Sequence, residues 1–463
     1  MRKYKRREFL KGLGFLGAGA LAGSLASKIT EAYSIPQVEK IYSPRHPDFP
    51  ADVIVYRDGD YAVAVDNKGN TIARSTDHAE VIQAAIDYLN SKSRYTSLLL
   101  TSMFEIDVPI ELYNYQKIFG YGWGTGLKAS TNFSGRALIT NKGYDNGWEI
   151  MHVRIENIEL NGNGVTNGID IQLYASVIKG CYIHNYSDYG IRLPKETGED
   201  NWIIENYITN HENNDAGTGI EHEFGHVHIA FNIIRDTATG IFSVGHNKII
   251  YANSIYGTPV CISVKNARLM YITKNMLNPS PGGLGIVVQP VLIGGYIETY
   301  KIVDNLIYGD YYTGIKLQGD STYRIENVEI IGNSFEAQPS TTRGYHIEAH
   351  YSDAVIKHNR FIIYPEASGI IETILNDNSN LIIKDNEGYK TENAGVAILS
   401  AGSTSVTVNH GLVSAPSKVL ITPLGQPPGK LWVPESSITD TSFDIVTDTA
   451  PSADLKIAWY AEV

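Results

Sequence analysis

Short runs of alternating apolar and polar residues fill the middle of the chain, and they recur at regular spacing. Alternation with a period of two is typical of β-strands. The motif apolar-x-x-Asn-x-apolar marks each recurrence, and successive copies lie 21 to 30 residues apart, as in solenoid proteins. The motif is centred on Asn206, Asn232, Asn253, Asn275, Asn305, Asn333, Asn359 and Asn386, and Cys181 and Ile158 occupy the same slot upstream.

Each repeat also contains a second mark, a glycine followed by an aliphatic residue. We therefore predict an all-β fold, a right-handed parallel β-helix of about ten coils over residues 76–393. Aliphatic side chains would fill the lumen, and the asparagines would form an internal ladder, because a side-chain amide bonds backbone groups of adjacent coils. The pairs begin at Gly168, Gly190, Gly219, Gly240, Gly285, Gly314, Gly344 and Gly369, and Pro259-Val260 substitutes in the remaining coil.

The two ends of the repeat region carry other patterns. Residues 33–75 are expected to form lead-in strands. Asp77 and Glu80 then make a capping-box-like pair, which predicts a short helix that caps the β-helix. Residues 394–463 alternate in short runs between turn residues and predict a small β-sandwich, which would cover the open end of the last coil. The predicted helix has an apolar stripe of Val81, Ala84, Ala85, Tyr88 and Leu89.

The entry into the repeat region resembles the pectate-lyase-like superfamily of parallel β-helix proteins. There a capping helix is followed by a strand, a Pro-Ile pair, a second strand and a Gly-x-Gly turn. The matching residues are Pro109-Ile110 and Gly120-Tyr121-Gly122. The resemblance implies action on polysaccharides by elimination, hydrolysis or epimerisation. Two signatures of that superfamily are missing, the Asp-Asp and Gly-His-Gly set of polygalacturonase-like hydrolases and the Asp-Pro-His motif of alginate epimerases; Gly245-His246-Asn247 is a partial match to the first.

The N-terminus resembles a twin-arginine export signal, with Arg6-Arg7-Glu8-Phe9-Leu10-Lys11 followed by an uncharged stretch from Gly12 to Ala26. That stretch is short and glycine-rich for a membrane span, and Thr30-Glu31-Ala32 is a candidate cleavage site. We therefore expect residues 1–32 to be a signal peptide and the folded protein to be secreted from a prokaryote or held at its surface. Retention as a membrane anchor is the alternative.

Net charge argues against one class of partner, and the cysteine positions argue against a disulfide. The formal net charge of −12 argues against nucleic acid, which requires a basic surface. Beyond the signal segment, no membrane partner is expected. The two cysteines, Cys181 and Cys261, lie about three coils apart, roughly 14 Å along the axis, which exceeds the reach of a disulfide.

His222-Glu223-Phe224-Gly225-His226 matches the H-E-x-x-H pattern of zinc peptidases, which functions on a helix. The repeat places it on a strand instead. With Ile220 pointing inward, Glu221 points out, His222 points into the lumen, and Glu223 points out. The register therefore excludes the helical zinc site. A different metal site that joins His222 and His226 across the turn stays open.

The same register aligns outward positions of successive coils. Asp170, Arg192 and Glu221 fall on three consecutive coils, with Glu223 beside them. Cross-strand charge pairing and a functional cleft are both open interpretations. The position two residues after each glycine reads Asp170, Arg192, Glu221, Phe242, Cys261, Val287, Lys316 and His346, and the next outward position reads Gln172, Pro194, Glu223, Val244, Ser263, Gln289, Gln318 and Glu348.

In the functional interpretation, the groove binds an acidic, uronic-acid-containing polysaccharide. Elimination needs a cation beside the sugar carboxylate and a base. Arg192 or Arg235 would hold the carboxylate, His226 or a tyrosine would take the proton, and Asp170, Glu221 and Glu223 would recruit Ca²⁺. Hydrolysis needs two carboxylates, one of them protonated, drawn from Glu221, Glu223, Asp215 and Asp236. The candidate substrate-binding residues are Asp170, Tyr189, Asp215, His228, Asp236 and His246.

A non-catalytic role is the rival hypothesis. Terminal β-sandwich modules of this kind resemble those that follow β-helices in phage-tail and surface proteins, where they cap, trimerise or bind sugar. The protein would then be an adhesin or a tail-spike-like glycan-binding structural protein, assembled as a homotrimer. Product formation from a polysaccharide distinguishes the two classes.

Overall fold

The computed structural model describes residues 50–463, except Ser93, 195–198, 214–215, Phe224, 266–268, 291–298, 339–343 and 365–370. The predicted signal segment 1–32 and residues 33–49 of the predicted lead-in lie outside the described residues. Within the described part of the chain, no helix combines the length and the apolar character that a membrane crossing requires.

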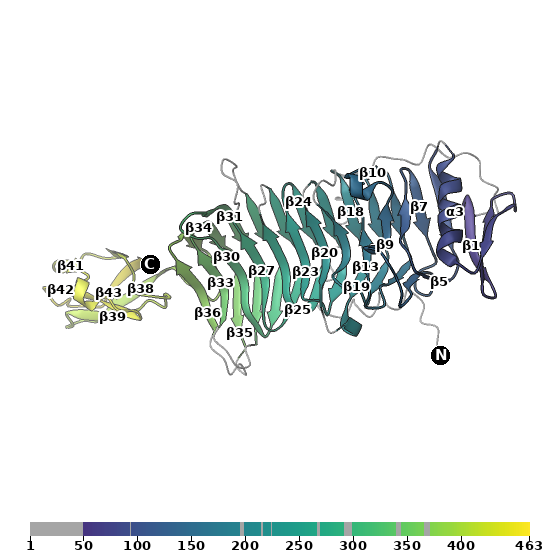
Figure 1. Cartoon of the computed structure of the whole chain (residues 1–463). Coiled ribbons are helices and arrows are strands. Elements are labelled where there is room, and N and C mark those ends of the chain that lie inside the picture. The colour runs from purple at the N-terminus through teal and green to yellow at the C-terminus, as the bar shows by residue number, and fades with distance from the viewer. Residues whose placement is uncertain are drawn as a thin grey trace. The chain divides into compact units, whose positions relative to one another are not determined.

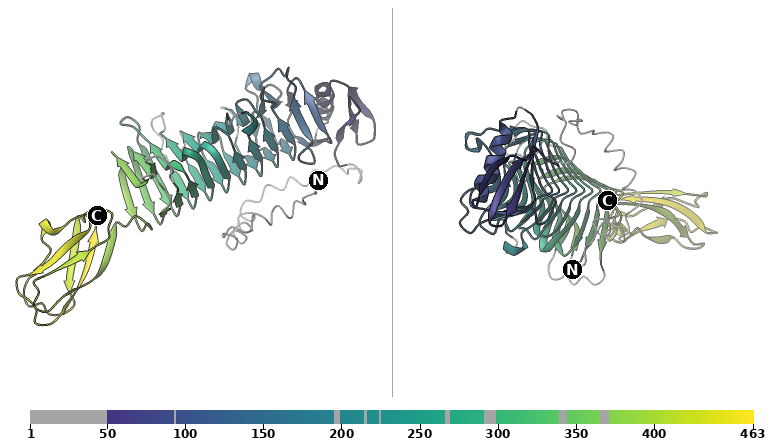
Figure 2. Two further views of the ribbon diagram at one scale, coloured as in Figure 1. Left: turned by 90° about the horizontal axis from the view of Figure 1, so that it is seen from below. Right: turned by 90° about the vertical axis from the view of Figure 1, so that its right-hand side faces the viewer.

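A stack of parallel coils forms the main body and confirms the predicted parallel β-helix (Figures 1 and 2). Each coil contributes one strand to sheet A and two consecutive strands to sheet B, which we call the first and second series. The sheet A strands of the coils are β4 (Thr96–Leu100), β7 (Gln116–Phe119), β11 (Arg154–Glu156), β15 (Val177–Lys179), β18 (Asn201–Ile204), β21 (Val227–Ala230), β24 (Lys248–Tyr251), β26 (Met270–Thr273), β28 (Tyr300–Val303), β31 (Ile325–Ile331), β34 (Ser352–Lys357) and β37 (Asn380–Lys384).

Sheet B contains the other two strands of each coil. The first series is β5 (Met103–Ile106), β8 (Gly126–Ala129), β12 (Glu159–Asn161), β16 (Tyr182–His184), β19 (Tyr207–Thr209), β22 (Ile233–Arg235), the first halves of β25 (Ser254–Lys265) and β27 (Met276–Gln289), β29 (Leu306–Gly309), β32 (Ser334–Ala337) and β35 (Arg360–Ile363). The second series is β6 (Ile110–Leu112), β9 (Ala137–Asn141), β13 (Asn167–Asp170), β17 (Tyr189–Leu193), β20 (Thr218–Glu223), β23 (Thr239–Val244), the second halves of β25 and β27, β30 (Tyr311–Gln318), β33 (Gly344–His350) and β36 (Ile371–Asp377).

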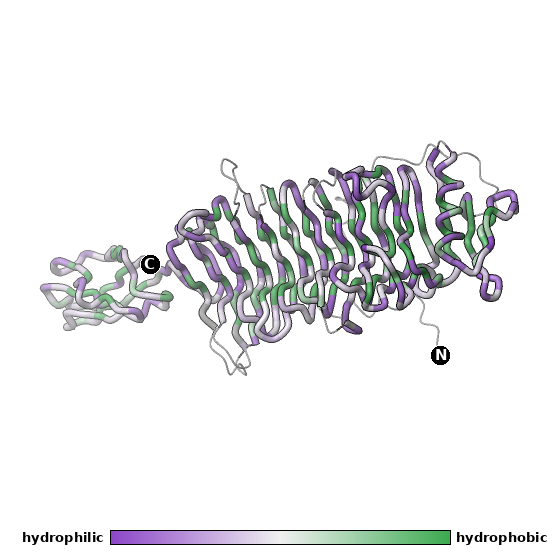
Figure 3. The backbone as a smooth tube through the Cα atoms, in the orientation of Figure 1, coloured by the Kyte–Doolittle hydropathy of each residue, from purple (hydrophilic) through white to green (hydrophobic). Residues whose placement is uncertain are grey.

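Identical side chains stack from coil to coil in the lumen. One column in sheet A consists of isoleucine alone over nine consecutive coils, and every member is buried. Each such side chain contributes about 1.5–3 kcal/mol by leaving water. The alternation of hydrophobic and hydrophilic residues along the strands is visible in Figure 3. The column is Ile155, Ile178, Ile203, Ile229, Ile250, Ile272, Ile302, Ile330 and Ile356.

The predicted asparagine ladder is present at the turn between sheet A and the first series. In the rung at Asn253, the side-chain Nδ2 donates to the carbonyl of Ile229 (2.9 Å) and to Oδ1 of Asn275 (3.0 Å). The backbone N–H of Asn253 donates to the same Oδ1 (2.9 Å). Cys181 forms the first rung, because its backbone N–H donates to Oδ1 of Asn206 (3.0 Å). The rungs satisfy buried backbone groups that the turn removes from the sheets.

The residue before each rung adopts the left-handed conformation. Most of these residues are not glycine, although a β-carbon makes that conformation costly by roughly 1–2 kcal/mol. The turn is therefore sharp and strained, and the ladder bonds stabilise it. The residues are Asn157, Gly180, Glu205, Phe231, Ala252, Lys274, Asp304, Gly332, His358 and Asp385, with φ between 52° and 69°.

A helix, α3 (His78–Asn90), packs on the first coil as predicted (Figure 1). Its N-cap is Asp77, whose Oδ1 accepts from the backbone N–H of Glu80 (3.0 Å). The buried face is wider than the predicted stripe, since Ile82 and Ile86 are also buried. Before the helix, an antiparallel meander joins sheet A through β1 (Val53–Asp58), β2 (Tyr61–Asp66) and β3 (Thr71–Ser75).

The C-terminal residues form two antiparallel three-stranded sheets, which confirms the predicted β-sandwich. Its core contains Leu399, Phe443 and Ile457, each buried completely. One sheet is β38 (Glu392–Leu399), β43 (Leu455–Glu462) and β40 (Lys418–Pro423), and the other is β39 (Ser405–Asn409), β42 (Ser442–Thr447) and β41 (Leu431–Trp432).

Two outward assignments are wrong. Ile241 aligns with Ile262, so Cys261 lies at the position that Gly240 occupies in the preceding coil, and the cysteine is fully buried. The register of Ile315 with Ile347 likewise puts His346 in the slot of Gly314, where it is buried. The slot needs a residue that fits against the next coil's carbonyl, and residues other than glycine fill it in these coils. The column of Glu221 holds Ser263 and Glu348 in these coils, which were predicted for the next outward column; that column holds Lys265 and His350 instead.

A polar pair, His222 and Lys248, also lies in the lumen. His222 is fully buried, as predicted, and its Nδ1 lies 2.6 Å from Nζ of the equally buried Lys248. The same Nζ donates to the carbonyls of His222 and Val244. Burial lowers the pKa of both side chains well below their ordinary values. The strand at His222 also excludes the helical zinc-peptidase site.

Replacing a central ladder residue, Asn253→Ala, is expected to lower the free energy of unfolding by at least about 3 kcal/mol, because several buried donors and acceptors lose partners. Thermal and urea unfolding measure the effect. The exposed Asn132→Ala change is the control and is expected to stay within about 0.5 kcal/mol of wild type. Equal midpoints for the two variants would contradict the structural role of the ladder.

The lumen pair predicts a pH-dependent stability. Because the pKa of Lys248 lies well below 10.5, the unfolded chain binds a proton that the folded chain lacks between the two values. Stability therefore rises with pH in this window, by up to about 1.4 kcal/mol per pH unit. The double variant His222→Leu/Lys248→Met, which matches Leu193 of the preceding coil, should lose that slope between pH 7 and pH 9 in urea unfolding. Identical slopes would show that Lys248 is charged when folded.

Candidate functional site

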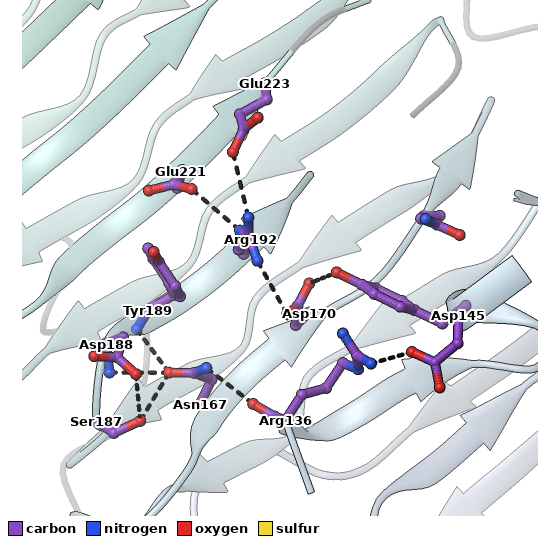
Figure 4. A network of polar contacts seen from close by, with 12 residues as sticks. Arg136, Asp145, Asn167, Asp170, Ser187, Asp188, Tyr189, Arg192, Glu221 and Glu223 are labelled. Carbon is purple, nitrogen blue, oxygen red and sulfur yellow. Dashed lines mark hydrogen bonds and ion pairs between the residues drawn. The ribbon is translucent and has the colours of Figure 1, made fainter. Parts of the chain in front are cut away.

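Arg192 lies at the centre of an acidic group on the outside of the second series (Figure 4). Its guanidinium contacts carboxylates from two other positions in the stack: Oδ2 of Asp170 on β13 (3.6 Å), Oε1 of Glu221 on β20 (3.1 Å) and Oε1 of Glu223 on β20 (3.3 Å). The guanidinium carbon also lies 5.1 Å from the ring centre of Tyr189. The predicted alignment of these residues on consecutive coils is thus present as direct contacts.

Strand register explains this arrangement. Asp170 pairs with Arg192 and Arg192 pairs with Glu221, so the three side chains leave the sheet at the same position. A period of two then puts Glu223 on the same face as Glu221. In front of β17, Oδ1 of Asn167 accepts from the backbone N–H groups of Asp188 (2.9 Å) and Tyr189 (2.8 Å). These two hydrogen bonds stabilise the turn that leads into the strand of Arg192.

The group continues toward the helical cap. The hydroxyl of Tyr144, in η3 (Tyr144–Asn146), donates to Oδ1 of Asp170 (2.6 Å). The guanidinium carbon of Arg136 lies 3.8 Å from the Tyr144 ring centre, and Arg136 pairs with Asp145. These three residues also line a cleft of about 760 Å³ beside the start of α3. The Arg192 group therefore borders an open cleft.

The surroundings of the carboxyl groups near Arg192 shift their pKa values. Burial raises the pKa of Glu221, Arg192 lowers it, and Glu223 raises it again through charge and a hydrogen bond, with a result of about 7. Burial also raises the pKa of Asp170, against the lowering effects of Tyr144 and Arg192. Burial alone would lower the pKa of Arg192, but Asp170, Tyr144 and Glu221 raise it. At neutral pH, Glu221 is thus a carboxyl that can donate a proton.

The acidic residues do not fit Ca²⁺ as they are placed. Ca²⁺ takes six to eight oxygen ligands, whereas Asp170, Glu221 and Glu223 each direct an oxygen to the guanidinium of Arg192. A cation in the same space would meet that positive charge. Across the part of the chain that the structure describes, no group of three or more His, Cys, Asp and Glu side chains is arranged to hold a metal ion.

Arg235 and Asp236 lie in a different place. Arg235 ends β22 of the first series and pairs with Asp236, with its guanidinium carbon 5.2 Å from the ring centre of Tyr256. Both residues line a second cleft of about 230 Å³, together with Tyr207 and Glu212. Because its strand series differs, the second cleft is separate from the Arg192 group.

The predicted histidines belong to a third place, at the sheet A side of the coils. Nδ1 of His226 lies 3.7 Å from Glu199 and 3.8 Å from Asp200. His228 stacks on Trp202 with ring centres 4.0 Å apart. His246 lies in the turn before β24, where Asn247 contacts His226. His222 bonds Lys248 in the lumen, so His222 and His226 do not share one metal site. Asp215 lies outside the described residues.

Two residues near the Arg192 group were not predicted. Glu111 on β6 pairs in register with Thr140, which continues the column of Asp170 toward the cap, and its carboxylate binds Lys142 (2.6 Å) rather than Arg192. Extending the repeat upstream from Ile139 and Ile169 would have found it. Tyr144 lies outside the repeat, and nothing in the surrounding sequence predicts its contact with Asp170.

Solved structures of other proteins share the fold of this chain. No protein-family model and no curated protein sequence matches the chain. The tailspike protein of E. coli bacteriophage HK620, solved with a pentasaccharide, is similar with a TM-score of 0.55 and 11% identity, over 86% of this chain and 92% of that chain. A variant of that tailspike solved with a hexasaccharide gives a TM-score of 0.53 and 11% identity, over 86% and 91%. At this identity, the likeness shows the parallel β-helix fold.

Removing the central cation tests the electrostatics of the group. Arg192→Met keeps the apolar stem but leaves Asp170 and Glu221 without a cation, so we expect a loss of about 3 kcal/mol at pH 8. The loss raises both carboxyl pKa values in the folded protein, so protonation relieves it, and the deficit should shrink toward pH 5. Urea unfolding at both pH values measures it.

The matched control is Arg360→Ala, which breaks an exposed pair with Glu387 and should cost less than about 1 kcal/mol at either pH. A deficit in Arg192→Met that stays constant with pH would show that the loss comes from packing rather than from the carboxylates.

Proposed function

We propose that this protein binds a polysaccharide on the outside of its β-helix and hydrolyses it at the Arg192 group. The observation that carries the proposal is the pKa of about 7 at Glu221, beside a second buried carboxyl group. Glycoside hydrolysis needs one carboxyl that is protonated at working pH and another that is ionised. Glu221 takes the first role and Asp170 takes the second.

The two carboxyls would act in an inverting reaction, in which one protonates the glycosidic oxygen and the other activates a water molecule. Asp170 and Glu221 come from strands two coils apart, roughly 9.6 Å along the axis, and each directs an oxygen to the guanidinium of Arg192. Glu221 would protonate the glycosidic oxygen while Asp170 activates the water. Glu223 supports the first step, because its charge and hydrogen bond help to retain the proton on Glu221.

Elimination on a uronic acid is less compatible with this group. Arg192 is shared by three carboxyl groups, so its positive charge is already balanced. A sugar carboxylate would gain little attraction and would meet further negative charge. The candidate base for elimination, His226, contacts Glu199 and Asp200 on the sheet A side instead. We therefore favour hydrolysis of a neutral stretch of polysaccharide.

The fold likeness supports the choice of partner. The similar tailspike is solved in complex with oligosaccharides, and its fold matches this chain over most of both lengths. We extend this to the protein as a proposal: an extracellular or surface-attached, glycan-binding β-helix that is exported through its N-terminal signal. A homotrimer fits the same proposal, and analytical ultracentrifugation tests it.

Glu221→Gln tests the catalytic assignment. Incubation of wild type with a panel of bacterial surface polysaccharides should release reducing ends from a neutral member without the ultraviolet absorbance of unsaturated products, whereas the polyuronates pectin and alginate should give little product. The rate should fall as pH rises through about 7, since Glu221 must be protonated. In Glu221→Gln, the rate should fall by roughly 10²–10⁴ while glycan binding is kept.

The control is Glu326→Gln on the exposed side of β31, which should leave the rate unchanged. Unsaturated products that disappear with a chelator would replace hydrolysis with calcium-dependent elimination. Tight binding without product from any polysaccharide would support the adhesin-like alternative.

A further inference from the structure

An aromatic cluster lies on the first series of sheet B, apart from the Arg192 group. Trp123 precedes β8 and stacks on Tyr182 with ring centres 4.4 Å apart and planes at 25°. It also lies 5.8 Å from the ring of Tyr207 on the next coil. Trp123 is nevertheless 68% exposed. A large indole that is held from one side and open on the other presents an apolar face to solvent.

A polar cleft adjoins this cluster. Tyr182 and Tyr207 form one wall of the 230 Å³ cleft, and Arg235 and Glu212 contribute to its rim. This combination is typical of small-ligand sites, where an apolar surface gives contact area and a few polar groups orient the ligand. Packing of the solenoid wall alone accounts for the tyrosines, but it does not account for an exposed tryptophan stacked on them.

His184 gives independent evidence for a ligand. Its ring stacks on Tyr182 (4.4 Å, 13°), and its Nε2 lies 3.2 Å from Oε1 of Glu159. The side chain is only 9% exposed, and its Nδ1 is buried without a hydrogen bond among the described residues. The nearest carboxylate oxygen, on Glu212, is 3.8 Å away. Since buried polar atoms are almost always bonded, Nδ1 is a position that a ligand hydroxyl would satisfy.

The charges of the cleft select the kind of ligand. Arg235 is paired with Asp236, and Glu159 and Glu212 add negative charge around His184. An anionic sugar would be repelled, whereas the hydroxyl groups of a neutral sugar can bond both carboxylates and the guanidinium. The flat, partly apolar face of a pyranose ring suits the open face of Trp123.

We propose that this cleft is a second carbohydrate subsite, in which Trp123 stacks on a neutral pyranose ring while His184, Glu212 and Arg235 bond its hydroxyls. The proposal rests on the proposed function for the class of ligand. The two sites share coils, because β16 and β17 are joined by residues 185–188. One polysaccharide chain would thus be held by the second subsite while the Arg192 group acts on another of its sugars.

Trp123→Ala tests the subsite. The probes are methyl glucopyranoside, methyl galactopyranoside and methyl N-acetylglucosaminide, with methyl galacturonoside as the anionic comparison. Affinity is measured by isothermal titration calorimetry, and contact with Trp123 in proteins that retain it is read from protection of tryptophan fluorescence against acrylamide. Wild type and Glu221→Gln should both show protection by at least one neutral glycoside and less by the anionic one. Trp123→Ala and Arg235→Gln should weaken that binding about tenfold.

Trp148→Ala is the matched control, since Trp148 is 65% exposed and lies outside the second cleft. It should keep wild-type affinity. If no neutral glycoside protects the fluorescence, or if Trp123→Ala binds as tightly as wild type, the subsite is overturned. Polysaccharide hydrolysis that depends on Glu221 would still stand in that case. Conversely, protection by a neutral glycoside without any hydrolysis would retain the subsite and remove the proposed reaction.

Discussion

The asparagine ladder is the interaction on which the remaining structure depends. Each rung bonds the next one and a carbonyl of the coil before it, so a shift of one residue in any coil would break bonds on both sides. The same rungs hold a left-handed residue, such as Ala252 or Lys274, in a conformation that costs free energy by itself. Because the ladder fixes one register for all coils, it also fixes which side chains share a column on the outer surface.

Fixed columns explain why the sequence predicts so much here. Asparagine spacing and strand alternation were enough to align Asp170, Arg192 and Glu221, which the structure joins through one guanidinium. The errors at Cys261 and His346 have one cause. The position beside the adjacent coil's carbonyl was recognised by its glycine, but Cys261 and His346 occupy it in their coils, so glycine alone does not mark this position.

The side-chain directions of turn residues could not be predicted from the repeat. A turn has no period, so the direction of His226 or Asp236 follows from its own backbone path and cannot be transferred from another coil. The candidates consequently divide among the three strand positions of the coil rather than forming one groove. Tyr144 and Trp123 were missed for the same reason, since both lie in loops whose contacts with distant coils depend on the three-dimensional path.

Both outer sites share an excess of carboxyl groups around a single arginine, and this has a consequence for substrate choice. At Arg192 the excess keeps a proton on Glu221, and at Arg235 it leaves hydroxyl-bonding oxygens beside an aromatic face. In each case the arginine serves neighbouring carboxylates and is not available to neutralise an anionic sugar. The whole chain has a formal net charge of −12, which would also repel a polyuronate at long range. The charge around each arginine and the net charge of the chain therefore both favour the neutral glycan of our proposal over an anionic one, although the fold by itself favours no substrate.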